Sequence, residues 1–355
     1  MTEGGRIRAE TIVPTKTAQA LRVGIVERFG GVSSTGNGAV TLLEFATYGN
    51  RIELSPDASG LSIWIEARDP AALFFLKEEM VARVAALDPI AARAIRWGGG
   101  DEAGAVPPTF SALRLIRTSD LAVGLRRLTL KGYDLGRFAC GGLHLRAIVP
   151  LHPGRAPVWP VLEANGATRW PRGADRLHMR VLTLRHMRIN SGELDLDVAI
   201  HGQGRLSTWA QSAQEGAVLG VMGSGGEAGL PASNGLLLAG DRSALPAIAR
   251  LLETLPAEAT GDLVLDVALE TAARAYLPPT RLRLHLLPEG RFPEQVEARL
   301  RELGRQRDVR HLWFGGRLDN ARKLRRLATN DFKLDPDQHS CTAYWREAPH
   351  RSKGT

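Results

Sequence analysis

The chain has 355 residues, 44% of them hydrophobic and 24% charged, which is typical of a soluble globular protein long enough for two or three domains. No apolar run approaches the length of a membrane-spanning helix, and the polar N-terminus lacks a hydrophobic signal segment, so we expect a cytoplasmic protein with no membrane span. The formal net charge is +8, and two cysteines, Cys140 and Cys341, are too few for a disulfide framework or a usual zinc site.

Residues 1–98 predict a small α/β sandwich. Apolar residues at helical spacing indicate a helix over Thr15–Phe29, and Pro70 opens a second helix at a position that favours proline. Strands with alternating or apolar character are predicted at Val40–Phe45, Arg51–Ser55 and Leu61–Ala67. The glycines from Gly98 onward and the acidic run to Pro108 are typical of a linker.

Residues 108–230 have the pattern of an antiparallel β-barrel. Short strands alternate with turns along this whole region, which is typical of antiparallel barrels. The predicted strands are Ala112–Thr118, Leu125–Gly132, Leu143–Val149, Met179–Arg188, Glu193–Ile200 and Val218–Met222.

Residues 231–355 alternate between strands and helices. The predicted strands are Gly235–Ala239, Asp262–Leu269, Leu282–Leu286 and Val309–Gly315. The predicted helices are one with Pro246 in its first turn, Pro293–Leu303 ended by Gly304, and Asn320–Thr329. This alternation predicts a Rossmann-like parallel sheet with a ligand crevice beyond the carboxyl ends of its strands. Gly240-Asp241 and Gly315-Gly316 follow two of these strands.

A basic strand and a small-residue turn form the most informative pattern. The strand is Arg180–Arg185, and the turn His201–Ala210 leads into a predicted helix. A helix N-terminus presents backbone N–H groups and favours negative charge. We place Arg180 and Arg185 on the same side of the strand, where forked hydrogen bonds can hold phosphate oxygens. The pattern suits a pyrophosphate, and so a dinucleotide such as FAD; ordinary exposed strand arginines are the alternative.

The positive charge is unevenly distributed. Residues 1–98 contain 11 basic and 11 acidic residues, so the whole excess lies in residues 99–355. Such an excess attracts anionic partners, but no nucleic-acid-binding motif is present, so we expect no nucleic acid. An anionic small substrate or a phosphate-bearing cofactor would use the same charges, and a solvated basic face is the simpler alternative. We find no metal-ligand cluster, nucleophile elbow or paired carboxylates, which fits hydride or electron transfer by a bound cofactor.

Six segments in this order resemble one family. They are Leu125–Leu130, Arg180–Arg185, His201–Ala210, Leu236–Ile248, Trp313–Gly316 and Tyr344–Arg346. Over about residues 108–348 the chain resembles the siderophore-interacting proteins, which are FAD-dependent ferric-siderophore reductases with a ferredoxin-reductase-like fold. Residues 1–98 resemble, less clearly, a small domain of unknown function that is sometimes fused to these reductases.

The resemblance implies roles for the matched residues. Arg180 would bind a flavin phosphate, with Arg185 as a lesser candidate for the same contact, and Thr183 would hydrogen-bond near the reactive flavin nitrogen as the catalytic candidate. The pyrophosphate turn would comprise His201, Gly202, Ser207, Thr208 and Trp209. The nicotinamide-nucleotide crevice would comprise Gly240, Asp241, Ser243, Pro246, Gly315 and Gly316, with Tyr344 and Trp345 closing over the site.

Three positions depart from the family pattern. The family has Tyr where this chain has Leu182, which keeps apolar contact with the isoalloxazine but loses π stacking. Arg242 and Arg317 occupy acidic positions of the family, and an arginine near the crevice would favour a nucleotide 2′-phosphate.

The expected function is reduction of a ferric siderophore. Electrons would pass from NADPH or NADH, or from a ferredoxin, through FAD to the iron of an anionic chelate, and the protein itself would ligate no metal. Two alternatives stay open: a chelate- or nucleotide-binding protein without catalysis, and a flavin reductase with another acceptor.

Overall fold

The structure is a computed structural model of the chain. It describes residues 6–29, 33–36, 40–45, 49–98, 103–138, 143–152, 154–201, 204–225, 229–230, 234–287 and 290–347. The chain divides into two compact units, one formed by Met1–Phe110 with Pro150–Leu177 and the other by Ser111–Val149 with His178–Thr355. The three-domain division drawn from the sequence stays a prediction.

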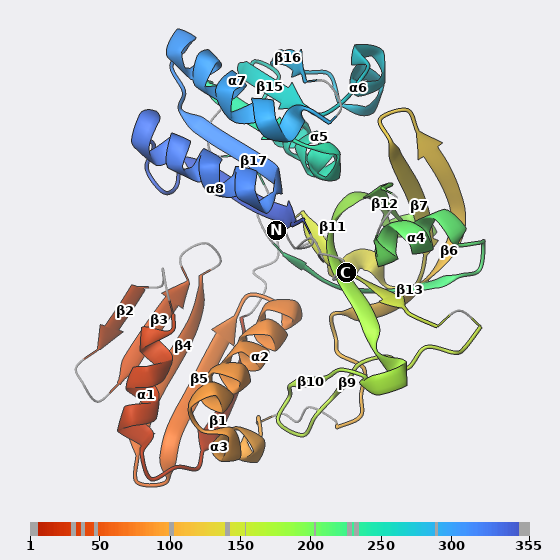
Figure 1. Ribbon diagram of the computed structural model, residues 1–355. Helices are drawn as coiled ribbons and strands as arrows, with labels where there is room; N and C mark the ends of the chain where they lie inside the picture. Colours follow the sequence, from red (N-terminus) through yellow and green to blue (C-terminus); the bar gives the residue numbers. More distant parts are fainter. Residues whose placement is uncertain are drawn as a thin grey trace, which may run out of the picture. The chain divides into compact units, whose positions relative to one another are not determined.

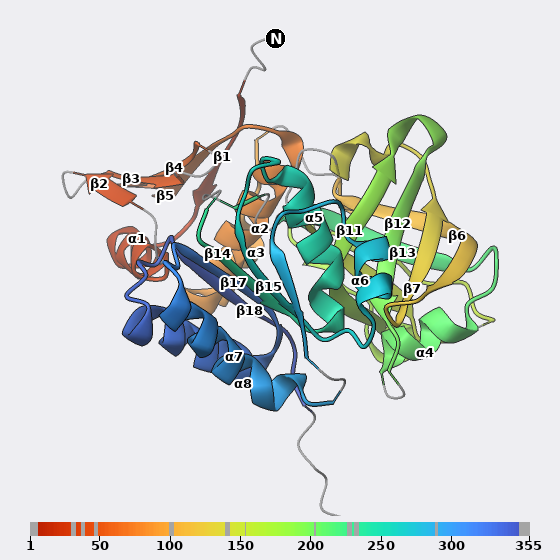
Figure 2. The ribbon, with the colours of Figure 1, turned by 90° about the horizontal axis from the view of Figure 1, so that it is seen from above.

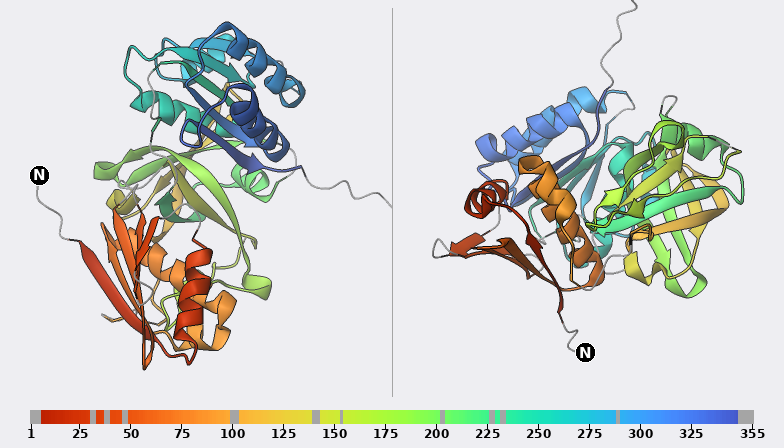
Figure 3. Two further views of the ribbon diagram at one scale, coloured as in Figure 1. Left: turned by 90° about the vertical axis from the view of Figure 1, so that its left-hand side faces the viewer. Right: turned by 90° about the horizontal axis from the view of Figure 1, so that it is seen from below.

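The first unit contains a five-stranded antiparallel sheet with helices on one face (Figures 1 and 3). The strand order is β1-β5-β4-β3-β2. The strands are β1 (Ile7–Val13), β2 (Ser33–Gly36), β3 (Thr41–Phe45), β4 (Asn50–Asp57) and β5 (Gly60–Ala67), and the helices are α1 (Ala18–Glu27), α2 (Pro70–Leu87) and α3 (Pro89–Ala94). The alternation in β5 buries Leu61, Ile63 and Ile65 against the helices, so this predicted strand is confirmed. The sequence reading missed β1, β2 and α3.

A hairpin from a distant segment packs on the same unit. Its strands are β9 (Val161–Leu162) and β10 (Thr168–Arg169). The Trp97 indole N–H donates to the Asn165 carbonyl at 2.9 Å, and the Asn165 amide donates to the Ala92 carbonyl at 3.0 Å. The backbone N–H of Thr168 donates to the Glu78 carboxylate at 3.0 Å. No sequence pattern predicted these contacts.

The second unit begins with a closed six-stranded barrel of order β11-β12-β7-β6-β13-β8. The elements are β6 (Phe110–Leu121), β7 (Leu125–Lys131), β8 (His144–Pro150), β11 (Leu177–Arg188), β12 (Glu193–Ala199), the helix α4 (Arg205–Ser212) and β13 (Val218–Gly225). All six strands correspond to predicted strands, because each alternates side chains between the leucine-rich barrel core and the outside.

The second unit continues with a parallel sheet covered by helices on both faces (Figure 2). Its strand order is β16-β15-β14-β17-β18. The elements are β14 (Leu236–Gly240), α5 (Leu245–Thr254), β15 (Gly261–Leu265), α6 (Glu270–Tyr276), β16 (Arg283–Leu286), α7 (Phe292–Gln306), β17 (His311–Arg317), α8 (Leu318–Arg326) and β18 (His339–Trp345). Leu236 and Leu238 of β14 pack with α5 and α6, and Leu237 packs with α7 and α8, so the sheet is buried on both faces.

The Rossmann-like prediction is confirmed, with local corrections. Gly304 does not end its helix: α7 continues to Gln306, and a Cβ on Gly304 would lie 2.2 Å from a ring carbon of Phe332, so glycine is needed for close packing. The strand predicted over Asp262–Leu269 ends at Leu265, and α6 and β18 were missed. Among the described residues, no helix is long and apolar enough to cross a membrane.

Candidate functional site

The strand β11 carries its predicted site residues on two faces. Leu182 and Leu184 pack toward the barrel core, so Thr183 and Arg185 point the other way. A β-bulge between Leu184 and His186 interrupts the strand alternation at Arg185, so the expectation that Arg180 and Arg185 share one side stays a prediction. Arg180 is exposed and, among the described residues, donates only to the neighbouring Met179 carbonyl.

Arg185 is held by the helix α5. It is 5% exposed, donates to the Glu253 carboxylate at 2.7 Å and lies 5.5 Å from the ring centroid of Tyr276. Arg250 of the same helix donates to the Leu184 carbonyl at 2.8 Å. These contacts link the barrel to the parallel sheet's helical layer, and the phosphate contact expected for Arg185 stays a prediction.

A polar series connects β11 to the last strand of the parallel sheet. Thr183 is buried, and its hydroxyl lies 3.4 Å from Nδ1 of His144 on β8. Nε2 of His144 lies 3.3 Å from the Tyr344 hydroxyl on β18, and the two rings meet edge to face at 5.6 Å. A neutral imidazole donates at one nitrogen and accepts at the other, so the direction of its hydrogen bond with Tyr344 sets the direction of its hydrogen bond with Thr183. The sequence reading missed His144, since nothing in the local sequence sets it apart.

The turn before α4 is tied together by a serine. The Ser207 hydroxyl is buried, donates to the His201 carbonyl at 2.7 Å and accepts from the His201 N–H at 3.0 Å. The Ser207 hydroxyl therefore ties the backbone of His201 to the first turn of α4. Thr208 is exposed, Trp209 packs partly against the barrel core, and Gly202 lies outside the described residues. α4 starts after Gly204 with no side-chain hydrogen bond capping its first turn.

The crevice residues meet where the strand order of the sheet reverses. Gly240 at the end of β14 pairs with Gly315 of β17, on either side of the switch point. A Cβ on Gly240 would lie 2.8 Å from Ala244, and one on Gly316 would lie 2.6 Å from an Asp241 oxygen. Neighbouring side chains therefore pack directly against these glycines, and Pro246 lies in the first turn of α5.

Asp241 organises this crevice. Its Oδ1 accepts from the backbone N–H and hydroxyl of Ser243, and its Oδ2 accepts from the Trp345 indole N–H at 2.7 Å. Burial raises the pKa of Asp241 above its ordinary value, and the hydrogen bonds from Ser243 and Trp345 only partly oppose this. Trp345 is thereby fixed at the crevice, next to Tyr344 and the polar series.

Arg242 and Arg317, the two arginines singled out in the sequence, follow Asp241 and Gly316 at the same crevice. Arg242 packs against Gly124 of the barrel, where an added Cβ would lie 2.9 Å from its guanidinium. Arg317 lies 3.5 Å from the Glu347 carboxylate.

Family models match nearly all of this second unit. Residues 114–228 match the siderophore-interacting FAD-binding domain, and residues 233–348 match the siderophore-interacting protein model. The chain belongs to the siderophore-interacting protein family. The barrel thus corresponds to the siderophore-interacting FAD-binding domain, and the parallel sheet corresponds to the siderophore-interacting protein model.

Individual relatives cover the same region. Ferric vibriobactin reductase ViuB of Vibrio cholerae is 28% identical over 244 residues, which is 66% of this chain and 88% of ViuB. The structure of the siderophore-interacting protein SipS from Aeromonas hydrophila is 27% identical, covers 67% of this chain and 99% of SipS, and superposes with a TM-score of 0.54. A siderophore utilization protein from T. fusca, 24% identical with a TM-score of 0.55 over 68% of this chain and 94% of its own, shows the same fold.

Proposed function

We propose that this siderophore-interacting protein is an FAD-dependent ferric-siderophore reductase that takes electrons from a reduced nicotinamide nucleotide. The observation that carries the proposal is the series Thr183–His144–Tyr344, which joins the strand expected to hold the flavin to the crevice of the parallel sheet. An oxidoreductase of this kind needs both sites side by side. The activity printed for ViuB supports the siderophore as substrate.

The barrel residues fit FAD. The first turn of α4 has backbone N–H groups without a side-chain cap, a position that favours a pyrophosphate. The exposed Arg180 has guanidinium donors beyond its one bond to Met179. Bound FAD would supply hydride acceptance followed by one-electron delivery, which no side chain can provide.

Thr183 is proposed to present a proton to the flavin. If Tyr344 donates to Nε2 of His144, Nδ1–H of His144 donates to the Thr183 oxygen, and the Thr183 hydroxyl hydrogen then points away from His144. Because Thr183 is buried, water does not compete for its hydroxyl group. His144 and Tyr344 act as positioning residues for it.

The crevice at Gly240, Gly315 and Gly316 is proposed to take the nicotinamide nucleotide. These glycines lie where the strand order of the sheet reverses, and the Trp345 indole is fixed there by its bond to Asp241. The arginines Arg242 and Arg317 favour NADPH over NADH, because a guanidinium pairs with a 2′-phosphate. A ferredoxin is the alternative donor.

The iron is substrate in this scheme. The described residues contain no group of three or more His, Cys, Asp or Glu side chains that could hold a metal ion. Reduction itself loosens the chelate, because hard oxygen ligands hold Fe(II) less tightly than Fe(III). The net charge of +8 would draw in an anionic chelate, with steering that weakens as salt rises.

Leu182 favours a second candidate function, which is binding of a chelate or nucleotide without catalysis. It is half-buried at the edge of the barrel core and offers no aromatic ring to the isoalloxazine. A protein with low flavin affinity would hold a chelate or nucleotide without catalysis.

Flavin content and turnover separate these functions. The purified protein is expected to show flavin absorbance, to bleach on addition of NADPH or NADH, and to release Fe(II) from ferric siderophores into a ferrous-specific chelator. Colourless protein whose spectrum and melting temperature do not respond to FAD would overturn the reductase proposal. Rapid flavin reduction without Fe(II) release from any ferric chelate would assign a different acceptor.

A further inference from the structure

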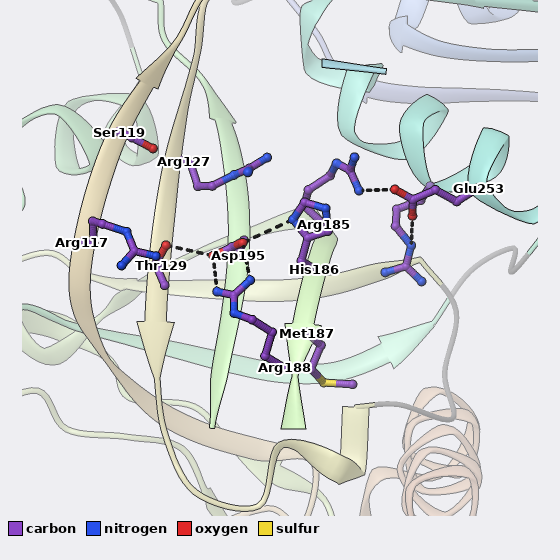
Figure 4. Close-up of a pocket in the computed structure, with 11 residues that line it drawn as sticks. Arg117, Ser119, Arg127, Thr129, Arg185, His186, Met187, Arg188, Asp195 and Glu253 are labelled. Carbon is purple, nitrogen blue, oxygen red and sulfur yellow. Dashed lines mark hydrogen bonds and ion pairs between the residues drawn. The ribbon is translucent and has the colours of Figure 1, made fainter. Parts of the chain in front are cut away.

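A groove on the outer face of the barrel contains a cluster of arginines. It has a volume of about 770 Å³ and lies among β6, β7, β11, β12 and the end of α5 (Figure 4). The arginines that line it are Arg117, Arg127, Arg185, Arg188 and Arg250.

The groove lies away from the turn proposed to hold the flavin pyrophosphate. Arg188, at the end of β11, pairs with Glu193 at the start of β12. The turn at His201 follows the opposite end of β12, on the side where β11 carries Arg180. The two sites therefore use opposite ends of the same strand pair.

Positive charge exceeds negative charge in this groove. The five guanidinium groups are accompanied by the lining carboxylates Asp195 and Glu253, by Asp197, which pairs with Arg127, and by Glu193, which pairs with Arg188. This leaves an excess of one positive charge before His186 is considered. An anionic ligand would balance it.

Buried carboxylates fix two of the arginines. Asp195 and Asp197 are each 3% exposed. Arg127 makes a forked pair with Asp197, with both bonds at 2.8 Å, and Arg188 makes a forked pair with Asp195 at 2.8 and 2.9 Å. Burial opposes ionisation of Asp195, but hydrogen bonds from His186, Arg188 and Thr129 outweigh it and hold its pKa well below the ordinary value. The guanidinium groups are thus positioned before any ligand arrives.

Several N–H donors in the groove have no acceptor. Nε of the buried Arg185 has no hydrogen-bond partner among the described residues. Nη1 of Arg127 is left over after its two bonds to Asp197. Arg117 is exposed on β6 and makes no hydrogen bond or ion pair within the described part of the chain. Of these groups, only the Arg185 Nε–H is a buried atom without a partner, and a buried, unpaired guanidinium N–H is unfavourable, so this position favours an acceptor.

We propose that the groove binds a phosphate group, either free phosphate or the phosphate of a small monoester. The unused donors come from β6, β7 and β11, and a phosphate offers oxygens in three directions, whereas a carboxylate offers only two in one plane. The volume of the groove leaves room for the organic part of a monoester beside the phosphate. This site is separate from the turn before α4 and from the nicotinamide crevice.

Binding to the FAD-loaded full-length protein tests the proposal without reductase activity. Calorimetry and melting temperatures are measured with inorganic phosphate, with ribose 5-phosphate, with ribose, and with sodium chloride at matched ionic strength. The variant Arg117→Ala removes the unpaired guanidinium, and Arg114→Ala removes an exposed arginine from the same strand outside the groove.

We expect saturable binding of one phosphate or one ribose 5-phosphate, with none of ribose. Tighter binding of the ester would identify a phosphomonoester as ligand, and equal binding would identify free phosphate. Arg117→Ala should weaken binding about tenfold, as loss of one charged hydrogen bond implies, while Arg114→Ala should leave it unchanged. Equal effects of both variants, or a stabilisation reproduced by sodium chloride alone, would overturn the proposal.

Discussion

Replacing Trp345 by Phe tests how the nicotinamide crevice is held. The change removes the indole N–H that donates to Oδ2 of Asp241 at 2.7 Å. A hydrogen bond to a charged acceptor contributes about 1.5–3 kcal/mol. Asp241 keeps its bonds from Ser243 and from the backbone of Arg317, and Trp345 is 41% exposed and so loses little buried area. We therefore expect the free energy of unfolding to fall by about 1.5 kcal/mol, the lower end of that range.

The loss should depend on pH in a defined direction. The pKa of Asp241 is raised in the folded protein, so the folded state binds more protons than the unfolded state between the two pKa values, and stability falls as pH rises through that window. Without the indole donor the ionised carboxylate is destabilised further. The cost of Trp345→Phe should be largest at neutral and alkaline pH and should decrease as pH falls through the raised pKa.

Urea denaturation followed by circular dichroism, at pH 5 and pH 8, measures this effect. In an Asp241→Asn background the same bond ends on a neutral oxygen, so Trp345→Phe should cost about half as much there. An equal cost at both pH values and in both backgrounds would show that Trp345 contributes only by packing, which would refute the reasoning.

The other predictions concern the flavin strand, the arginine groove and α7. Leu182→Tyr should tighten FAD binding about threefold to tenfold through ring stacking, as measured by quenching of flavin fluorescence; weaker binding would mean that the ring does not fit beside the barrel core. Asp195→Asn should destabilise the protein by about 1–3 kcal/mol at pH 7, because it replaces the buried charged acceptor of Arg188 and Thr129 by a neutral one, while Arg188 keeps its bond to Glu193. Because the folded pKa of Asp195 is lowered, its contribution is present above the unfolded pKa and is lost as pH falls, so the variant should lose less stability on acidification than the wild type. Gly304→Ala should destabilise by about 1–3 kcal/mol despite the better helix propensity of alanine, and the additional change Phe332→Leu should recover part of the loss; stabilisation by Gly304→Ala alone would contradict the packing seen here.

Local sequence patterns were sufficient for most of the fold. The six barrel strands and the strands before Gly240 and Gly315 were found because each must bury alternate or successive apolar residues. Short or polar elements such as β2 and α6 were missed, because tertiary contacts rather than their own periodicity stabilise them.

The contacts of individual site residues were harder to predict from the sequence than the secondary structure. Ser207 was selected as a phosphate contact, yet its hydroxyl serves the backbone of His201. The β-bulge between Leu184 and His186 interrupts strand alternation, so counting positions from Arg180 to Arg185 does not decide whether they share one side.

The amino-acid sequence by itself determined which segments become strands and helices, and it placed glycines and Asp241 at the ends of adjacent parallel strands. Only the tertiary structure decided that His144 lies between Thr183 and Tyr344, and that arginines from separate strands and α5 share one groove. Apolar periodicity is a property of neighbouring residues and can be read directly. Polar contacts across a barrel depend on strand register and closure, which emerge only when the whole chain has folded.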